Sequence, residues 1–459
     1  MTSEVLARIQ PELIGQALRF PRVYQAYQDL YAVRPTAEQQ AERQAQRLDA
    51  LLRQVLTDVP AWRDLGINPT DDPHELLRSL PTLTKEQITD DLSAHVSDQL
   101  DPAQCVAVVT SGTTGRPLRI IHSAEHLIHS AATELARQTA YGLPFDRKTL
   151  QPFKMGGAGW LEYTAVNTGF TRVAEFGFLE EMDKAARAEI ARRCVAFAPD
   201  AVFSHPTRIA GLVELLVEAG IDHLAVPVIR TFGETLTQPL RELFSDFFGG
   251  KVRNQYALNE VSTVASECDH GSMHVDTHRL WVEILDADGE PVPAGVPGEV
   301  TVTNFFNPVM PFVRYRTDDI AAWSGEPCGC GDPAPTLSLI AGRDHGAIAF
   351  GDGTSIDALR VVRAIEHVPL SRLQVVQDEQ GLTILVSPLP HTPDERRPDG
   401  WVDGPCVDGV AAAVEQAVRS VVGDRLTITV REAAEADFHR TGRREKTPSF
   451  VSLVPTSVR

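Results

Sequence analysis

An alternation of short apolar runs and longer amphipathic stretches at residues 105–230 constrains the fold more than any other feature of this sequence. The runs CVAVVTS at 105–111 and DAVFSH at 200–205 have the length and composition of strands. The stretches at 123–140 and 209–220 repeat apolar residues at helical spacing. Strands that alternate with helices predict a largely parallel sheet covered by helices.

The two ends of the chain have a different texture. Residues 1 to about 60 carry helical periodicity. Thr84, directly before KEQITDDL, is expected to cap a helix. From about residue 273 onward, β-type runs joined by Asp-Gly and Pro/Gly turns predict a barrel or a twisted sheet. The last part carries the strand-like runs LQVVQ, LTILVSP and LTITVRE in a smaller α+β unit.

These patterns predict an α/β protein of several subdomains. A large N-terminal domain, residues 1–342, would hold mostly parallel, helix-covered sheets together with a β-rich part at about 268–341. A small, mobile α+β C-terminal domain would comprise residues 343–459.

The charge balance excludes several classes of function. The net charge is -19, from 43 Lys+Arg against 62 Asp+Glu, and such a field repels nucleic acid and anionic membrane surfaces. No apolar run approaches the roughly 18 residues that cross a bilayer. The first residues lack the basic and apolar regions of a signal peptide. We therefore expect a cytoplasmic protein that binds neither nucleic acid nor membrane, and a reducing compartment argues against disulfides among its six cysteines.

A phosphate-binding loop is predicted directly after the first strand-like run. Two glycines allow a tight backbone and a close approach to an anion, while hydroxyls, backbone N–H groups and one guanidinium supply donors and charge. The loop is not a Walker P-loop, and the alternative is a polar turn between strands. Its residues are Thr110, Ser111, Gly112, Thr113, Thr114, Gly115 and Arg116.

This loop resembles the phosphate loop of the adenylate-forming superfamily of acyl-CoA ligases, luciferases and adenylation domains, with Arg116 in place of the usual Lys. Five further segments resemble the superfamily's motifs in the same order along nearly the whole chain. They lie at 231–234, 255–260, 314–319, 342–343 and 441–446. Shorter segments of the sequence outside these motifs are most similar to the phenylacetate-CoA ligase branch of the superfamily.

The resemblance implies a role for each of these segments. The backbone around Gly233 and Glu234 would border adenine and substrate, and the ring of Tyr256, flanked by Ala257 and Asn259, would pack on adenine. Glu260 would hold Mg²⁺. The ribose hydroxyls would bind Asp319, with Arg343 also touching the ribose.

Lys446 would be the catalytic lysine, although Arg443 and Arg444 crowd the same loop. Adenylation builds negative charge on the phosphate oxygens and on the leaving group. The useful protein groups are therefore cations and fixed donors, and a base is little needed. The predicted catalytic residues are Lys446 and Arg116, which supply positive charge, and Glu260, which would hold Mg²⁺.

Four residues have the composition of a structural zinc site. Cys268-x₅-His274 and Cys328-x-Cys330 supply three thiolates and an imidazole, a tetrahedral set that leaves no open position. His270 is a rival for His274. The alternative is a group of free cysteines with unrelated histidines.

The acid pocket of the superfamily corresponds here to Phe153, Met155, Gly156, Trp160, His205 and Phe232. Their apolar and aromatic character fits a small aryl acid, and equally fits an ordinary core. After Gly342-Arg343 the chain reads Asp344-His345-Gly346, which departs from the usual acidic hinge pair. An Asn-Pro loop typical of acyl-CoA ligases is also missing, so adenylation is better supported than transfer to CoA.

The leading hypothesis is an enzyme that uses ATP and Mg²⁺ to activate a small, aromatic carboxylic acid as acyl-AMP, releasing pyrophosphate, and carries structural Zn²⁺. CoA, an amine or a carrier protein could then accept the acyl group. A second hypothesis keeps AMP activation but changes the activated group to nitrite or a cofactor phosphate. A third is an inactive, zinc-stapled binding protein. No residue pattern indicates the oligomeric state.

Overall fold

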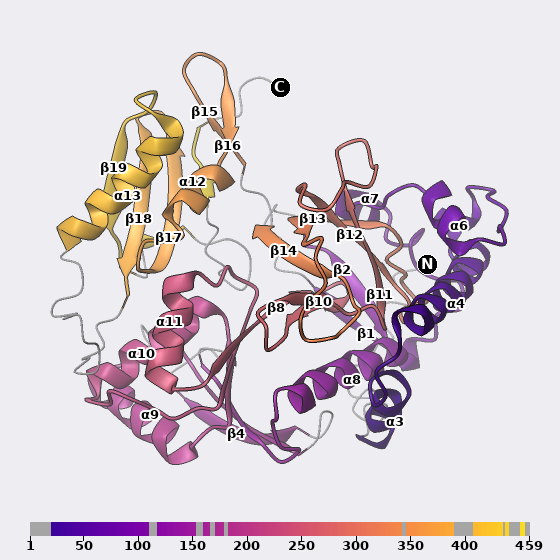
Figure 1. The fold of residues 1–459 in the computed structure, drawn as a ribbon, viewed down its shortest axis with the longest axis horizontal. Coiled ribbons are helices and arrows are strands. Elements are labelled where there is room, and N and C mark those ends of the chain that lie inside the picture. The colour runs from indigo at the N-terminus through magenta and orange to yellow at the C-terminus, as the bar shows by residue number, and fades with distance from the viewer. Residues whose placement is uncertain are drawn as a thin grey trace. The chain divides into compact units, whose positions relative to one another are not determined.

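A computed structural model gives the architecture of the chain (Figure 1). The structure describes residues 20–109, 117–152, 159–165, 170–178, 182–341, 346–389, 407–434, 437–439 and 450–454. The chain divides into two compact units, one made of residues 1–146, 164–171 and 253–343, the other of residues 147–163, 172–252 and 344–459. The domain boundary expected at 342/343 falls outside the described residues and stays a prediction.

The first unit begins with helices that bury one face each. The long helix α4 (Ala37–Asp58) turns Leu48, Leu52 and Val55 into the core, at the spacing that the sequence shows. Thr84 caps α7 and forms a capping box with Gln87, as predicted. The helices of this unit are α3 (Phe20–Leu30), α4, α5 (Pro60–Arg63), α6 (Pro73–Ser79), α7 (Lys85–Asp90) and α8 (Ala124–Ala140).

Seven strands of the first unit follow the order β11-β12-β13-β14-β10-β9-β8, and each of these neighbours is antiparallel. Their inward side chains form one hydrophobic core with α4 to α7. The strands are β8 (Lys251–Leu258), β9 (Ser262–Glu267), β10 (Met273–Val275), β11 (Leu280–Leu285), β12 (Gly298–Asn304), β13 (Tyr315–Trp323) and β14 (Thr336–Ala341). The predicted β-rich character of this region is confirmed.

The strands β1 (Cys105–Val109) and β2 (Arg119–Ser123) form a separate antiparallel pair, in which Cys105 lies opposite Ser123. The alternation pattern had placed the first run in the parallel sheet, and this detail is wrong. A parallel crossover needs a dozen or more residues, and the connection between these two strands is shorter than that. The phosphate-loop segment therefore joins two strands of a hairpin.

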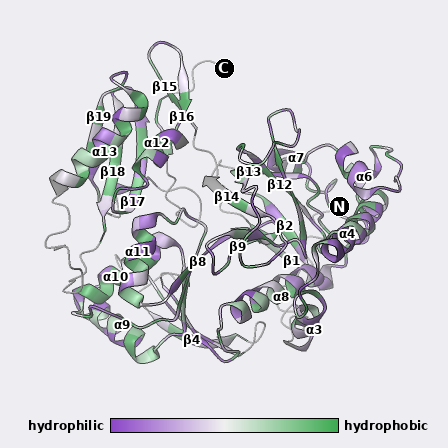
Figure 2. Cartoon of the chain, viewed as in Figure 1, coloured by the Kyte–Doolittle hydropathy of each residue, from purple (hydrophilic) through white to green (hydrophobic). Residues whose placement is uncertain are grey.

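The second unit contains the predicted helix-covered parallel sheet, with strand order β7-β6-β3-β5-β4. The pairs β6/β7, β3/β6 and β3/β5 are parallel. Leu150, Val202 and Ile229 of its strands pack with the apolar faces of the helices, which show mixed hydropathy (Figure 2). The elements are β3 (Lys148–Gln151), β4 (Trp160–Ala165), β5 (Thr171–Phe176), α9 (Lys184–Phe197), β6 (Ala201–Ser204), α10 (Pro206–Glu218), β7 (Val228–Phe232) and α11 (Gln238–Phe248).

The C-terminal part of the second unit is the expected small α+β body. Its sheet has the order β19-β18-β17-β20, and its core is shared with two helices. The three strand-like runs in the sequence correspond to β17, β18 and β19. The elements are β15 (Ala347–Ala349), β16 (Ser355–Asp357), α12 (Leu359–Ile365), β17 (Leu370–Asp378), β18 (Gly381–Pro388), α13 (Val407–Val422), β19 (Ile428–Glu432) and β20 (Phe450–Ser452). Among the described residues, no helix is both long and apolar enough to cross a bilayer.

Candidate nucleotide and metal sites

Two phenol–carboxylate pairs bring together three of the predicted nucleotide residues in the first unit. The hydroxyl of Tyr256 on β8 donates to Oδ2 of Asp319 on β13 at 2.6 Å. The hydroxyl of Tyr315 on β13 donates to Oε1 of Glu260, in the turn between β8 and β9, at 3.2 Å. Glu260 is 0% exposed and Asp319 is 3% exposed. Each of the two buried carboxylates thus accepts a hydrogen bond from a phenol.

From Tyr315 to Asp319, buried residues of β13 alternate with more exposed ones, although the strand bulges here against β12. Tyr315 and Asp319 point to one face together with buried Thr317, whose hydroxyl accepts from the backbone N–H of Asp319 at 3.1 Å. Arg314 forms an ion pair with Glu283 on β11 at 3.3 Å.

Arg316, also outside that face, pairs with Glu299 on β12. The two arginines of the predicted segment therefore anchor the strand, and the tyrosine and the second aspartate form the site.

The predicted Gly-Glu element lies at the carboxyl ends of β6 and β7 in the second unit. The rings of His205 and Phe232 lie 4.6 Å apart between centroids. Gly233 has φ +75, and a Cβ there would meet the His205 ring at 2.9 Å, so any other residue would be strained. Oε2 of Glu234 accepts from the backbone N–H of Thr207 at 3.1 Å and from its hydroxyl at 2.7 Å.

Glu234 is partly buried, and its carboxylate lies at the N-terminus of α10, where backbone N–H groups lack helical partners. Burial acts to raise its pKa, but the neighbouring His205 and the hydrogen bonds from Thr207 outweigh burial and lower the pKa below its ordinary value. The carboxylate therefore stays charged. It fixes the helix start beside the two rings.

Trp160 lies in a different group of side chains. Its ring stacks parallel to Phe176 at 6.1 Å and meets Phe197 edge-on at 6.1 Å. Its indole N–H donates to Oε1 of Glu162 at 2.9 Å. None of these described contacts is with His205 or Phe232.

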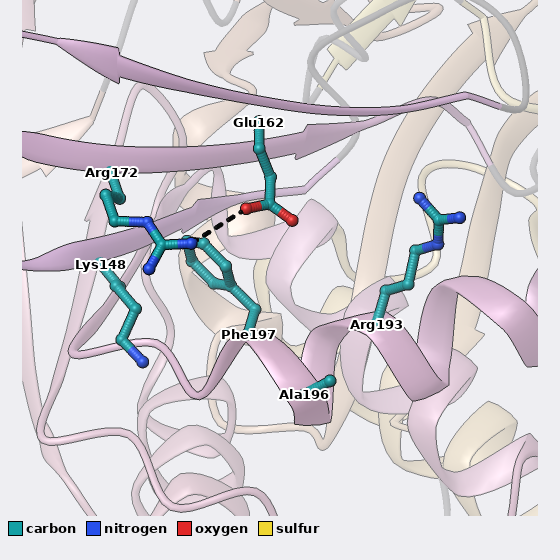
Figure 3. Close-up of a pocket in the computed structure, with 6 residues that line it drawn as sticks. All are labelled: Lys148, Glu162, Arg172, Arg193, Ala196 and Phe197. Carbon is teal, nitrogen blue, oxygen red and sulfur yellow. Dashed lines mark hydrogen bonds and ion pairs between the residues drawn. The ribbon is translucent and has the colours of Figure 1, made fainter.

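A pocket of about 260 Å³ is lined by Lys148, Glu162, Arg172, Arg193, Ala196 and Phe197 (Figure 3). Lys148 begins β3 and Arg172 lies near the start of β5, so the pocket is at the amino ends of the parallel strands. Ligands of open α/β sheets bind at the carboxyl ends, where His205 and Phe232 lie. This pocket therefore lies at the other end of the strands from the predicted acid-binding residues His205 and Phe232, and we assign it no role in adenylation.

Four side chains converge as the zinc prediction expects. The ligand atoms of Cys268, His274, Cys328 and Cys330 all lie within 4.8 Å of one another. Sγ of Cys330 lies 3.3 Å from Nε2 of His274, and Sγ of Cys268 lies 3.6 Å from Sγ of Cys328. Three thiols and one imidazole at such spacing have the composition of a closed metal site.

The neighbours of this cluster decide between the two candidate histidines. Nδ1 of His274 lies 3.0 Å from the carbonyl oxygen of Ala334, which can only accept, so Nδ1 carries the proton and Nε2 is left with its lone pair. His270 is exposed and lies outside the cluster of four, although its backbone N–H donates to Sγ of Cys268 at 3.3 Å. The geometry favours His274.

Several predicted site residues lie outside the described residues. They are Thr110, Ser111, Gly112, Thr113, Thr114, Gly115, Arg116, Phe153, Met155, Gly156, Arg343 and Lys446. Conversely, Tyr315 was not predicted as a site residue. It lies four residues before Asp319 in β13 and both are buried. A bulge between Arg316 and Ile320 interrupts the regular pairing, so strand periodicity alone did not identify Tyr315.

Comparison with known proteins defines the class of this chain. Residues 27–306 match the AMP-binding enzyme family, and this match covers more than half of the sequence. The chain therefore belongs to the AMP-binding enzymes and is an adenylate-forming ligase, which confirms the predicted superfamily.

Its curated relatives include phenylacetate-coenzyme A ligases, and the chain resembles this branch of the family. It is 26% identical to the Thermus thermophilus ligase over 78% of this chain and 79% of the relative. It is 30% identical to the Escherichia coli ligase over 60% of this chain, and spans 65% of that relative. A crystal structure of 2-hydroxyisobutyryl-CoA ligase in the postadenylation state has a TM-score of 0.70 at 15% identity, covering 91% of this chain and 90% of that one. That likeness supports the fold.

Proposed function

We propose that this enzyme joins a carboxylic acid to the AMP moiety of MgATP, releases pyrophosphate, and then transfers the acyl group to CoA. The observation that carries the proposal is the buried pairing of Tyr256 with Asp319 and of Tyr315 with Glu260. Buried carboxylates held in fixed orientation suit two tasks in nucleotide binding: accepting hydrogen bonds from ribose hydroxyls, and holding a hard cation. The names of the curated relatives support CoA as the acceptor.

The first half-reaction needs no base from the protein. A carboxylate oxygen of the acid bonds to the α-phosphorus, and the bond from that phosphorus to the oxygen bridging to the β-phosphate breaks, so that pyrophosphate leaves with the electron pair. Glu260 would hold Mg²⁺, which neutralises charge on the phosphates. Arg116 with its loop and Lys446 would add fixed positive charge, on the strength of the superfamily resemblance.

In the second half-reaction the thiol sulfur of CoA bonds to the acyl carbon, the bond from that carbon to the AMP oxygen breaks, and the thiol proton is released to solvent. Asp319 would remain hydrogen-bonded to the ribose hydroxyls through both half-reactions. The Tyr256 phenol would hold this carboxylate in the accepting orientation.

We propose a small aromatic acid as the substrate. The ring of Phe232 packs against both Phe203, at 4.6 Å, and His205, also at 4.6 Å, at the carboxyl ends of β6 and β7. Gly233 presents bare backbone next to these rings. A flat ring can stack on such a surface, and the relatives named as phenylacetate-CoA ligases act on an acid of this class.

We also propose that Cys268, His274, Cys328 and Cys330 hold one structural Zn²⁺. The four donors leave no position for a substrate, so the ion would staple the segment after β9 to the loop before β14. Its role would be to stabilise the sheet that carries Asp319.

ATP–pyrophosphate exchange with a panel of acids tests the proposal. We expect exchange with phenylacetate or benzoate and little with short aliphatic acids, followed by an acyl-CoA product when CoA is added. Lys446→Ala should lower the exchange rate by about 10²–10³-fold, the usual loss for one preorganised cation or donor. Exchange with aliphatic acids alone would overturn the aromatic assignment, and no exchange with any acid would overturn the adenylation of carboxylates.

A matched pair of variants ties the activity to the site. Asp319→Asn should abolish most exchange, because the amide cannot accept as a carboxylate does. Asp318→Asn changes the adjacent, exposed residue, whose φ of 63 asparagine tolerates, and should leave exchange unchanged. Equal activity of the two variants would contradict the assignment of Asp319.

A further inference from the structure

Two buried histidines contact the turn that carries Glu260. His122 is the next-to-last residue of β2 and His126 lies in the first turn of α8. Their rings stack 4.4 Å apart with an interplanar angle of 11°. Nε2 of His122 lies 2.9 Å from the backbone carbonyl oxygen of Asn259, and Nε2 of His126 lies 3.2 Å from the hydroxyl oxygen of Ser262. One imidazole thus touches each end of Asn259–Ser262, which comprises the turn after β8 and the first residue of β9.

The hydrogen-bond partners determine which ring nitrogens carry protons. Oδ1 of Asn304 accepts from the backbone N–H of Phe306 at 3.1 Å, so its amide nitrogen faces Nδ1 of His126, at 3.0 Å, and donates to it. Nδ1 of His126 is therefore the acceptor, and Nε2 carries the proton that is donated to Ser262. The carbonyl of Asn259 can only accept, so Nε2 of His122 is also an N–H donor.

Both imidazoles are neutral in this environment. Burial lowers the pKa of His122 to about 4. Burial, followed by the charge of His122, lowers the pKa of His126 well below its ordinary value. The pair therefore offers two N–H donors at neutral pH.

This proton arrangement excludes one catalytic role. A serine paired with a histidine resembles a nucleophile with its base, but here the histidine donates to the hydroxyl, and a base would have to accept from it. What Ser262 does show is strain: its φ of 64 lies in the left-handed region that non-glycine residues rarely adopt. The hydrogen bond from His126 holds the residue in that conformation.

The histidines are themselves held firmly. Ser123 is the last residue of β2 and the N-cap of α8. Its backbone N–H donates to Oδ1 of Asn307 at 2.9 Å, and its hydroxyl caps α8 by accepting from the N–H of His126 at 3.0 Å. Asn304 and Asn307 are both 0% exposed. The donors that meet the turn are fixed to the core.

We propose that His122 and His126 are positioning residues, which fix both ends of Asn259–Ser262 and so set the Glu260 carboxylate for Mg²⁺. The inference rests on the proposed function, in which Glu260 holds the ion. Tyr315 orients the carboxylate from β13, while the two imidazoles orient the backbone that presents it. Groups that orient a metal ligand typically change metal affinity by about 10–100-fold when removed.

The test measures how much Mg²⁺ strengthens ATP binding, as the ratio of ATP affinities in Mg²⁺ and in EDTA by calorimetry. His126→Leu should reduce this ratio by about tenfold or more. His126→Gln places an amide N–H near the position of Nε2 and should restore most of the ratio. The matched control is His129→Leu: this ring also lies in α8, packs on Phe306 at 3.7 Å, and is not a contact of the turn. It should lower stability without changing the ratio.

Ser262→Gly provides a second variant in case His126→Leu does not fold. Glycine accepts the φ of 64 without strain, and the change removes the hydroxyl that His126 holds, so the Mg²⁺ enhancement should fall in a folded protein. The positioning role would be overturned if His126→Leu and Ser262→Gly kept the wild-type ratio of ATP affinities, including the case in which ATP affinity falls equally in Mg²⁺ and in EDTA. If wild type shows acid-dependent exchange but no Mg²⁺ enhancement of ATP binding, this inference fails and the proposed function stands. If wild type binds no ATP, the proposed function fails.

Discussion

Replacing Tyr256 by phenylalanine tests the part that its hydroxyl would have in ATP binding. The substitution keeps the ring that would pack on adenine and removes only the hydroxyl that donates to Asp319 at 2.6 Å. The carboxylate of Asp319 is 3% exposed, so water replaces the lost donor poorly. We expect the carboxylate to lose its fixed orientation, which ATP would then have to restore on binding.

The size of the effect follows from the charge of the acceptor. A hydrogen bond to a charged group contributes about 1.5–3 kcal/mol. The lower end corresponds to roughly a tenfold rise in the Kd for ATP. In the proposed function Asp319 would bind the ribose hydroxyls, so the variant should also discriminate less between ATP and 2′-deoxy-ATP than the wild type does. Calorimetric titration with both nucleotides measures both effects.

Tyr163→Phe is the matched control for this prediction. The hydroxyl of Tyr163 donates to Oε1 of the buried Glu175 at 2.7 Å, a bond of the same chemistry in the other unit. Its loss should leave the Kd for ATP unchanged. The reasoning would be refuted if Tyr256→Phe bound both nucleotides as the wild type does, or if both phenylalanine variants weakened ATP binding equally.

Three further outcomes are expected. Metal analysis should find about one Zn²⁺ per chain, and Cys330→Ser should remove it and lower the Tm by about 5 °C or more, whereas His270→Ala should change neither. Burial lowers the pKa of His122 from 6.5 to about 4, so as the pH falls the unfolded chain takes up a proton at this residue before the folded protein does. The free energy of unfolding therefore decreases below pH 6.5. His122→Gln should reduce this decrease, measured by urea unfolding between pH 6.5 and pH 4, by up to about 1.4 kcal/mol per pH unit. Gly233→Ala should destabilise the protein by about 1–2 kcal/mol in urea unfolding, because of its positive φ and the 2.9 Å approach of a Cβ to the His205 ring.

Local patterns in the sequence were sufficient to predict most of the architecture. Alternation at residues 105–230 predicted the parallel sheet, and Thr84 predicted a helix start, because both signals act over a few neighbouring residues. The antiparallel pairing of β1 with β2 was not predicted, because the sequence of an apolar run does not show whether its neighbouring strand is parallel or antiparallel.

The residues of the candidate site were likewise only partly predictable from the sequence. The resemblance to the superfamily's motifs implied Glu260 and Asp319, but it could not show that the hydroxyl of Tyr315 donates to Glu260. The contact of His126 with Ser262 joins residues 136 positions apart, and no periodicity links such positions. Likewise, the choice of His274 over His270 depends on the register of β10 against its two neighbours.

The strand β13 has a consequence for how this family member can vary. Its outward residues form ion pairs with neighbouring strands, as Arg316 does with Glu299, and other charge pairs could replace them. Between Arg316 and Ile320 the strand bulges against β12, and Asp318 has φ 63, so Tyr315 and Asp319 share a buried face only because this irregular stretch has its present number of residues. This stretch can therefore diverge in composition between homologues, while its length should be invariant.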